Sequence, residues 1–387
     1  MKERCSCVFC CDSQYCIDKK TFSSNKKIGV SGLMRVRNDE EFIEQAIDSC
    51  IDALDELVIV YNGCKDCSPD IIRRKAIQYK NKIRYYEYKP IVYATNLTEA
   101  EYNFIKSQPV NSPHLLANYY NFGLSKVTYK YVMKIDADQI YFTERLQEIC
   151  DAYRSNKKKY PSVMNLLCFL YVYFSLLFYK KTGVDLLFLK QKLFLRYKKT
   201  LLKLISIFKL PVFFSGYNVF FDNGVWYSTL GKNVDNNVNI LSPFNGLLDH
   251  TLFRLSDKTY FEPYEQTEYS LLNSYNYAVI EAFKGVKWAL PMGFMWIHLN
   301  SIRKNTIENQ KFNFITFPNA YMDFNKFLNT PFRRINCTND DLILQKQIKR
   351  FYSILHDSTS QFTRIYISKF VSNYYFDFQQ YILKKKY

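Results

Sequence analysis

The chain lacks most of the features that mark an exported, zinc-binding or repetitive protein. Its N-terminus, MKERCSCVFCCDSQYC, contains no apolar stretch of the length that a secretory signal needs. Five of the 11 cysteines crowd into these first 16 residues, at a spacing that fits no standard zinc site. Cys64 and Cys67 form a lone C-x-x-C pair, so a zinc ribbon is not expected, and the sequence has no internal repeats. We therefore expect a protein of the reducing cytosol, with a flexible cysteine-rich tail at residues 1–27.

Acidic residues are scarce in one part of the chain. Residues 152–210 contain 13 Lys or Arg side chains and one acid, Asp185, so this segment carries +12 of the net charge of +17. The composition as a whole excludes a disordered chain, because 48% of the residues are hydrophobic and 23% are charged. The length suits one large domain or two ordinary ones.

Apolar strands alternate with amphipathic helices in the first part of the chain. The pattern predicts strands at 28–34, 56–61, 83–88 and 129–135, and helices at 39–51, from Ser68-Pro69 onward, and at 115–125. Such alternation is typical of a parallel sheet flanked by helices. Ligands of these folds bind at the carboxyl ends of the strands, where the polar loop of residues 62–69 lies.

The second half is less regular. Its patterns predict short strands at 212–218, 219–222 and 226–229, a polar loop at 231–246, a helix from about Asp249 to Leu255 and a strand at 287–298. From about residue 340 the apolar and basic residues recur at helical spacing, which predicts a helical tail.

Asp136-Ala137-Asp138 is the only D-x-D sequence in the chain, and it directly follows a predicted strand. Both carboxylates are therefore expected at the ligand-binding edge of the sheet. Two carboxylates there can hold a divalent cation, and the cation can neutralise a diphosphate. The alternative interpretation is an acidic turn or a helix N-cap.

Four short motifs together carry a resemblance to a known family. They are Met34–Asn38 (MRVRN), Tyr61–Asp66 (YNGCKD), Tyr119–Asn121 (YYN) and Lys134–Tyr141 (KIDADQIY). In this order, within about residues 28–150, the chain resembles the nucleotide-binding half of GT-A glycosyltransferases of bacterial family 2. More narrowly, it resembles the β-1,4-N-acetylgalactosaminyltransferases that build lipooligosaccharide outer cores. It departs from the usual D-D-G-S-x-D loop, since Tyr61 and Asn62 stand where two carboxylates are usual.

The resemblance implies an α/β fold of the GT-A (Rossmann-like) type, with a mixed sheet flanked by helices. It also implies a UDP-sugar donor and a Mn²⁺ or Mg²⁺ cofactor. The resemblance implies that Arg35, Arg37 and Asn38 line the nucleotide site and that Asn62 and Asp66 approach the base and ribose. It also implies that Asp136 meets the ribose or a metal-bound water and that Asp138 binds the metal. Cationic side chains and a metal together suit an anionic leaving group. For Arg35 and Arg37, a solvated strand end remains the alternative.

Two candidates lie in the second half. An inverting transfer needs a general base for the acceptor hydroxyl, and Asp249, at the start of a predicted helix, is the best placed candidate; a plain helix cap is the alternative. His298 ends a predicted strand, and the resemblance implies a C-terminal histidine in the metal shell. A structural histidine is the alternative there.

The basic segment is also rich in Leu, Phe and Tyr. Residues 163–179 contain only two polar residues, Asn165 and Ser175, but as a helix they would span about 25 Å, short of a hydrocarbon core of about 30 Å. Residues 186–210 place Leu and Phe beside Lys and Arg, as in a helix that lies on an anionic membrane. The alternatives are a soluble helical hairpin packed on the domain and a transmembrane hairpin.

These expectations divide the chain into five segments. They are the tail at 1–27, a nucleotide-sugar-binding half at 28–150, a membrane-associating insert at 151–210, an acceptor-binding half at 211–330 and a helical basic tail at 331–387. The predicted function is an inverting, metal-dependent transfer from a UDP-sugar to a lipid-linked or other glycan acceptor, on the cytoplasmic face of the inner membrane. The alternatives are a nucleic-acid-binding protein, which the mixture of charge with long apolar runs disfavours, and an inactive membrane scaffold of the same fold.

Overall fold

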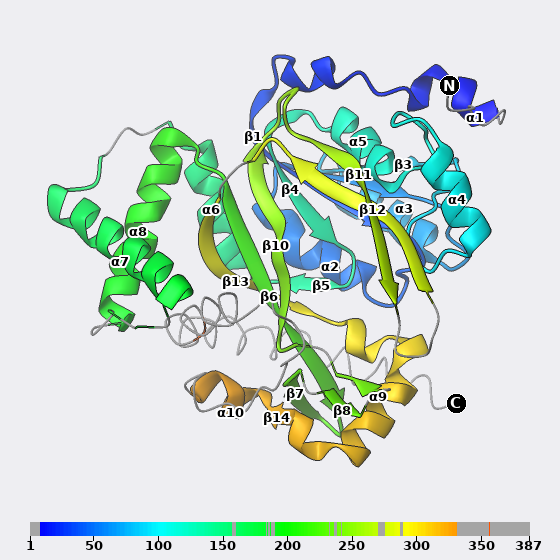
Figure 1. Cartoon of the computed structure of the whole chain (residues 1–387). Coiled ribbons are helices and arrows are strands. Elements are labelled where there is room, and N and C mark those ends of the chain that lie inside the picture. Colours follow the sequence, from blue (N-terminus) through cyan, green and yellow to red (C-terminus); the bar gives the residue numbers. More distant parts are fainter. Residues whose placement is uncertain are drawn as a thin grey trace. The chain divides into compact units, whose positions relative to one another are not determined.

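The computed structural model describes residues 8–156, 160–182, 184, 186, 190–231, 233–235, 238–240, 242–269, 275–286, 289–330 and 356 (Figure 1). The chain divides into two compact units. Unit 1 comprises Met1–Asp138 and Thr251–Leu290, and unit 2 comprises Gln139–His250 and Pro291–Tyr387. The boundary therefore falls inside the D-A-D-Q sequence, and the expected acceptor half at 211–330 is shared between the units.

Unit 1 has the predicted α/β class. Its strands, in the order in which they pair, are β10 (Phe244–Arg254, from Thr251 onward), β4 (Tyr129–Asp136), β1 (Lys27–Val36), β2 (Glu56–Tyr61) and β3 (Ile83–Glu87). The pairs β4–β1, β1–β2 and β2–β3 are parallel, whereas β10 runs antiparallel to β4. The first five residues of β2 are buried, as expected for a central strand of a parallel sheet.

Unit 1 contains five helices and three 3-10 turns among the described residues. They are α1 (Val8–Cys11), α2 (Ile43–Cys50), α3 (Ser68–Gln78), α4 (Glu99–Ser107) and α5 (Leu116–Lys126), with short 3-10 turns η1 (Ser13–Tyr15), η2 (Lys19–Ser23) and η3 (Ile51–Ala53). α3 has Pro69 in its first turn. α2 starts four residues later than predicted. Before it, the backbone N–H groups of Asp39 and Glu40 donate to Ser68, at the start of α3, and to Asp66 of the preceding loop.

Among the elements of unit 1 that were not predicted are the helix α4 and the two strands of a hairpin. α4 starts at a capping box, in which Thr98 accepts from the backbone of Glu101 while the Glu101 carboxylate accepts from Thr98. The antiparallel hairpin of β11 (Tyr260–Tyr269) and β12 (Tyr275–Lys284) packs on α5 (Figure 1). α5 in turn lies against β1, and Gly123 permits this approach, because a Cβ there would lie 2.5 Å from Leu33 Cδ1.

Residues 8–26 differ from the flexible tail that we expected. Tyr15 and Phe22 are buried in the hydrophobic core of unit 1. The ring of Tyr15 meets Tyr88 edge to face at 5.1 Å and lies 5.7 Å from Phe122. This segment therefore belongs to the core; residues 1–7 lie outside the described part of the chain.

Unit 2 has a second group of strands. In the order in which they pair, they are β14 (Tyr321–Asp323), β7 (Val225–Thr229), β6 (Val212–Asp222) and β10. In addition, β13 (Leu290–His298) pairs with both β5 (Gln139–Tyr141) and β6. A separate two-stranded sheet consists of β8 (Asn233–Asp235) and β9 (Val238–Asn239). The two predicted pieces at 212–222 form the single strand β6. The helix predicted from Asp249 to Leu255 is wrong, because these residues lie in β10 and its end. Pairing with β4 at Leu252 and Phe253 selects the strand for a sequence whose apolar pattern fits both structures.

The helices of unit 2 include the two predicted for the basic segment. They are α6 (Thr143–Arg154), α7 (Val163–Thr182), α8 (Lys190–Phe208), α9 (Lys304–Thr316) and α10 (Phe324–Asn329), with 3-10 turns η4 (Asn300–Ile302) and η5 (Pro318–Ala320). α7 packs against α8, and α8 against α6 (Figure 1). Within the described residues, every helix is too short or too polar to span a bilayer. The tail predicted at 331–387 lies outside the described residues, except for His356.

The close approach of Trp296 in β13 to Gly216 in β6 predicts the effect of one small substitution. A Cβ at Gly216 would lie 2.0 Å from Nε1 of the buried Trp296. Gly216→Ala should therefore lower the free energy of unfolding by about 1–3 kcal/mol, measured by urea denaturation. In a Trp296→Leu background the same change should cost less than about 1 kcal/mol. An equal cost in both backgrounds would contradict the proposed clash.

Candidate functional site

The carboxyl ends of β1, β2 and β4 bring the predicted residues of unit 1 together. Arg35, near the end of β1, is paired in register with Val60 of β2 and with Asp136 of β4. Tyr61, which replaces a carboxylate of the usual motif, stands opposite Val36. Arg35 and Asp136 are therefore neighbours across two parallel strands, at the edge where the sequence predicted a ligand site.

Tyr119 fixes this edge from α5. Its hydroxyl donates to the carbonyl of Val60 at 2.6 Å and lies 3.4 Å from the carbonyl of Val36. Burial raises the pKa of Tyr119, so the hydroxyl keeps the proton that it donates. The second residue of the Y-Y-N motif, Tyr120, faces Arg35, and the third, Asn121, exchanges two hydrogen bonds with the backbone of Phe261 in β11.

The loop after β1 is shaped by short polar contacts. Arg37 is exposed, and its backbone N–H donates to Asp39 at 2.9 Å. Asn38 has a φ of +59°, a left-handed conformation that asparagine tolerates better than most residues. Its side-chain oxygen accepts from the backbone N–H of Lys65 at 2.7 Å. The guanidinium of Arg37 thus extends from a loop that is tied to the loop after β2.

Asn62 and Asp66 have structural partners that the sequence did not reveal. The buried Asn62 donates through Nδ2 to the carbonyls of Tyr88 and Pro90, at 2.6 and 2.8 Å. The two carboxylate oxygens of Asp66 accept from the backbone N–H groups of Glu40 and Ser68, at 2.9 and 3.0 Å. Both side chains therefore set the shape of the loop that was predicted to receive the base and ribose.

The C-x-x-C pair in this loop shows no activation of its thiols. Burial raises the pKa of Cys64, and the neighbouring charge of Glu40 raises the pKa of Cys67. Since the thiolate is the nucleophile and the metal ligand, both shifts oppose such chemistry at neutral pH.

A group of charged side chains behind the strand ends was missed by the sequence analysis. The guanidinium carbon of Arg35 lies 4.7 Å from the centre of the Tyr120 ring, and Nζ of Lys134 lies 5.4 Å from the same centre. Lys134 also pairs with Glu281 of β12 at 3.6 Å, and both side chains are nearly buried. Lys134 belongs to the K-I-D-x-D motif, but no local signal in the sequence marks Glu281.

This group of charges affects Arg35 directly. Burial alone would lower the pKa of Arg35, but the opposing influence of Tyr120, Glu281 and Asp136 is larger, and the net shift is upward. Arg35 is therefore a permanent cation beside Asp136. The hydroxyl of Tyr120 is buried, and no group among the described residues hydrogen-bonds to it, although such groups usually are partnered.

Asp136 and Asp138 are both half-buried and flank the buried Ala137. Within the described residues, no group of three or more His, Cys, Asp or Glu is arranged to hold a metal ion. Two carboxylates nevertheless fit Mg²⁺ or Mn²⁺, because a cation of this kind usually binds one or two carboxylates together with substrate phosphates and waters. The chemistry of these two carboxylates therefore fits a metal that binds together with a diphosphate.

His298, at the end of β13 in unit 2, has a defined tautomer. Asn218 donates through Nδ2 to the carbonyls of Ser242 and Phe244, at 2.7 and 3.2 Å, so its Oδ1 is the acceptor. Nδ1 of His298 lies 2.7 Å from that oxygen and must therefore carry the proton. In the neutral imidazole the lone pair is then on Nε2. In metal sites, a hydrogen bond of this kind from the other ring nitrogen also orients the histidine that binds the metal.

Asp249 lies in β10 rather than at a helix start, so the cap that we weighed as its alternative role does not exist. Its side chain lies outside what the structure describes.

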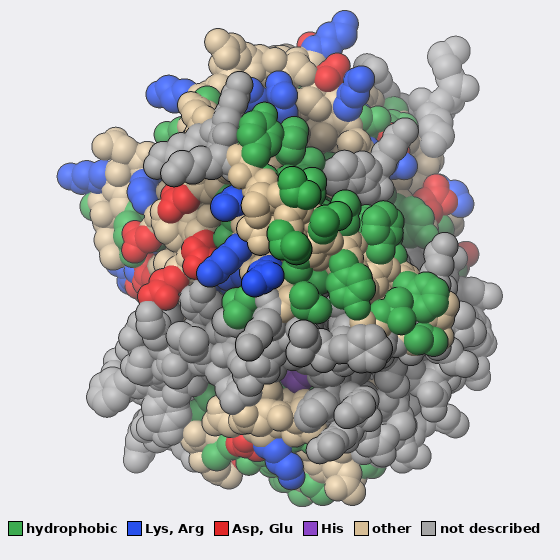
Figure 2. Space-filling view, turned by 90° about the vertical axis from the view of Figure 1, so that its left-hand side faces the viewer, with side chains coloured by type: hydrophobic (Ala, Val, Ile, Leu, Met, Phe, Trp, Pro, Cys, Tyr) green, Lys and Arg blue, Asp and Glu red, His purple; other side chains and the backbone are tan. Residues whose placement is uncertain are grey.

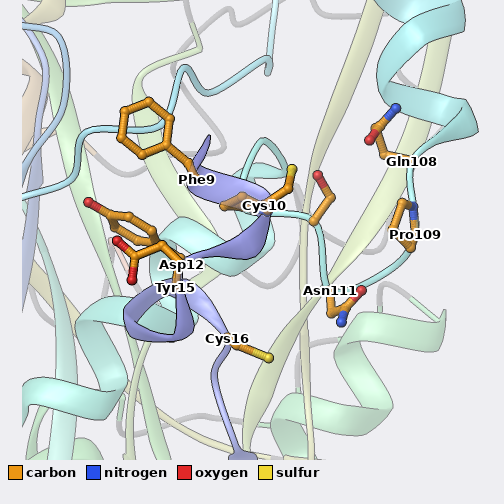
Figure 3. A pocket seen from close by; sticks show the side chains of 10 residues that line it. Phe9, Cys10, Asp12, Tyr15, Cys16, Gln108, Pro109 and Asn111 are labelled. Atoms are coloured by element: carbon orange, nitrogen blue, oxygen red, sulfur yellow. The ribbon is translucent and has the colours of Figure 1, made fainter. Parts of the chain in front are cut away.

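A small cavity lies elsewhere in unit 1, between the N-terminal segment and the loop after α4 (Figure 3). Its lining includes Cys10, Asp12, Cys16 and Asn111, and its volume is about 60 Å³. The Asp12 carboxylate already accepts from the backbone and side chain of Gln14. The cavity is too small for a nucleotide sugar and has none of the predicted site residues.

Comparison with known proteins gives only partial matches. No protein-family model matches the chain, and no curated protein matches it. Among solved structures, S. aureus TarS (residues 1–349) aligns at 15% identity over 32% of this chain and 32% of that chain, with a TM-score of 0.21. Glucosyl-3-phosphoglycerate synthase from Mycobacterium tuberculosis, in complex with Mn²⁺, UDP and glucosyl-3-phosphoglycerate, aligns at 19% identity over 32% of this chain and 37% of that chain, with a TM-score of 0.20. The aligned part thus spans about a third of each of these structures.

Proposed function

We propose that the chain is a metal-dependent glycosyltransferase of the GT-A type that uses a UDP-sugar. The observation that supports this proposal most is the strand register that pairs Arg35 with Asp136 and leaves Asp138 two residues further on, at the carboxyl edge of the parallel sheet. A permanent cation and two carboxylates at that edge suit a substrate that carries both a diphosphate and a divalent cation.

The residues of unit 1 divide the work of donor binding. Arg35 would face the diphosphate, and the exposed Arg37 would add a second cation from the neighbouring loop. Asn62 and Asp66 act by shaping the loop that receives the base and ribose, and Asn38 links that loop to the end of β1. Asp136 would meet the ribose or a water on the metal, and Asp138 would hold Mn²⁺ or Mg²⁺, which would supply positive charge to the UDP leaving group.

The transfer itself is proposed to invert the configuration at the anomeric carbon of the donor sugar. The acceptor hydroxyl attacks that carbon, the bond to the UDP oxygen breaks, and UDP leaves with the electron pair of that bond. Asp249 on β10 is the proposed base that takes the hydroxyl proton. The proposed donor sugar is GalNAc or another hexose or HexNAc, and the proposed acceptor is a lipid-linked or lipooligosaccharide glycan on the cytoplasmic face of the inner membrane.

Asp138→Asn tests the metal site with little change of shape. It should lower the turnover of the donor about a thousandfold, because a metal contributes several kcal/mol to the stability of the charged transition state. The assay is UDP release from UDP-GalNAc, UDP-galactose, UDP-GlcNAc and UDP-glucose, with and without EDTA.

Asp151→Asn is the matched control for this test. Asp151 is an exposed aspartate on α6 that pairs with Arg154, and its substitution should leave UDP release unchanged. Unchanged turnover in Asp138→Asn would refute the metal site. If the wild type releases UDP from none of the four donors, the chain is an inactive scaffold of the same fold.

His298→Gln tests the remaining proposed ligand. It should weaken Mn²⁺ binding in the presence of UDP by tenfold or more, and Asn218→Ala should weaken it about tenfold, because the Nδ1–H bond no longer fixes the imidazole. Isothermal titration with Mn²⁺ measures both. His114→Gln serves as control, since His114 bonds to the carbonyl of Ile91 in unit 1. If Mn²⁺ affinity stays at the wild-type value in a folded His298→Gln protein, His298 is structural.

A further inference from the structure

One side of α7 is an unusually large apolar surface. Nine hydrophobic side chains on it are between 38% and 75% exposed: Val163, Met164, Leu166, Leu167, Leu170, Tyr171, Phe174, Leu177 and Phe178. Their spacing of three and four residues places them on one face over four turns of helix. Figure 2 shows hydrophobic side chains gathered in a broad patch on the corresponding side of the molecule, with Lys and Arg side chains at its margin. Soluble monomers rarely leave a surface of this kind open.

The opposite side of α7 already has its packing partner. Phe169 is buried and stacks on the buried Tyr197 of α8, with ring centres 4.9 Å apart. Val172 is fully buried, and Thr200 of α8 lies 3.5 Å from the carbonyl of Asn165. The helix is therefore anchored in unit 2 through one face, and the exposed face is not required by that core.

Cations accompany the apolar face. Arg196, Lys199 and Lys203 of α8 are exposed, whereas Lys198 is paired with Glu148 of α6 at 3.0 Å. In the sequence, three lysines precede α7 and two lie near its end, within the segment that carries +12. A second copy of the chain docked on this face would bring two such segments together, which like-charge repulsion opposes.

We propose that this face of α7 docks on an anionic lipid bilayer, with the helix lying in the plane of the interface. Aliphatic and aromatic side chains on one face, with basic residues nearby, are the features of a helix that enters the boundary between headgroups and acyl chains. The basic residues are attracted to the negative surface of the bilayer. The proposal rests on the proposed function only for its purpose, which is to bring the donor site to a lipid-linked acceptor.

Flotation with lipid vesicles tests the docking surface. The full chain should float with vesicles of phosphatidylcholine and phosphatidylglycerol at a ratio of about 7:3, and much less with phosphatidylcholine alone. The triple variant Leu167→Gln, Phe174→Gln, Phe178→Gln should bind the anionic vesicles at least tenfold more weakly. The variant Arg196→Gln, Lys199→Gln, Lys203→Gln should bind more weakly and lose much of its dependence on salt.

The matched control changes equally exposed apolar residues elsewhere. Ile77→Gln in α3 with Phe312→Gln and Ile315→Gln in α9, all exposed, should leave flotation at the wild-type level. Absence of wild-type flotation, or equal loss in the control, would overturn the proposal. So would salt-sensitive binding to DNA without binding to vesicles, or a dimer that the α7 variant dissociates.

Donor assays separate this proposal from the proposed function. The triple variant of α7 should retain metal-dependent UDP release from a soluble donor, because none of its three positions is among the residues proposed to bind the donor or the metal or to act as the base. If the wild type floats and the α7 variant does not, the docking surface stands even where no donor is turned over. If donor turnover is found but the wild type does not float, the transferase stands and the docking surface is refuted.

Discussion

The parallel register of β1 between β2 and β4 is the constraint on which the candidate site depends. It makes Arg35 the neighbour of Val60 on one side and of Asp136 on the other. Because side chains alternate along a strand, a shift by one residue would turn Arg35 to the other face of the sheet and remove it from the Tyr120 ring. Tyr119 opposes such a shift, since its hydroxyl bonds to a carbonyl at the end of β2 and approaches one at the end of β1. The same register therefore determines both the packing of α5 and the charges at the edge of the sheet.

Two cations next to one aromatic ring need compensation, and the β11–β12 hairpin supplies it. Lys134 and Arg35 both lie over Tyr120, and Glu281 from β12 pairs with Lys134. A buried charge without such a partner is strongly destabilising. The hairpin is in turn held on α5 by the two hydrogen bonds between Asn121 and Phe261. The hairpin is thus part of the electrostatics of the candidate site, although it lies more than a hundred residues further along the chain.

The sequence allowed the four parallel strands β1, β2, β3 and β4 of unit 1 to be predicted, because each is a largely apolar run that ends at polar residues. The D-x-D motif and Arg35 could be placed at one edge for the same reason. β10 could not be predicted, since LLDHTLFRL fits a helical and an extended pattern equally well and pairing with β4 selects the strand. The role of Glu281 depends on a contact across 147 positions of sequence, and the roles of Asn62 and Asp66 depend on carbonyl and N–H groups that only the folded loop brings near them.

The net charge of +17 separates into parts with different physical roles. Arg35 and Lys134 lie within unit 1, where compensation by Glu281 and Asp136 limits their effect on the surrounding solvent. In the basic segment, Lys198 forms an ion pair with Glu148, whereas Arg196, Lys199 and Lys203 are exposed on α8. Attraction between these cations and an anionic surface acts over about 10 Å and weakens with salt, whereas burial of apolar area acts only on contact. The charge attraction would act first and the apolar burial second. The exposed cations would therefore bring unit 2 to an anionic surface, and the apolar face of α7 would hold it there.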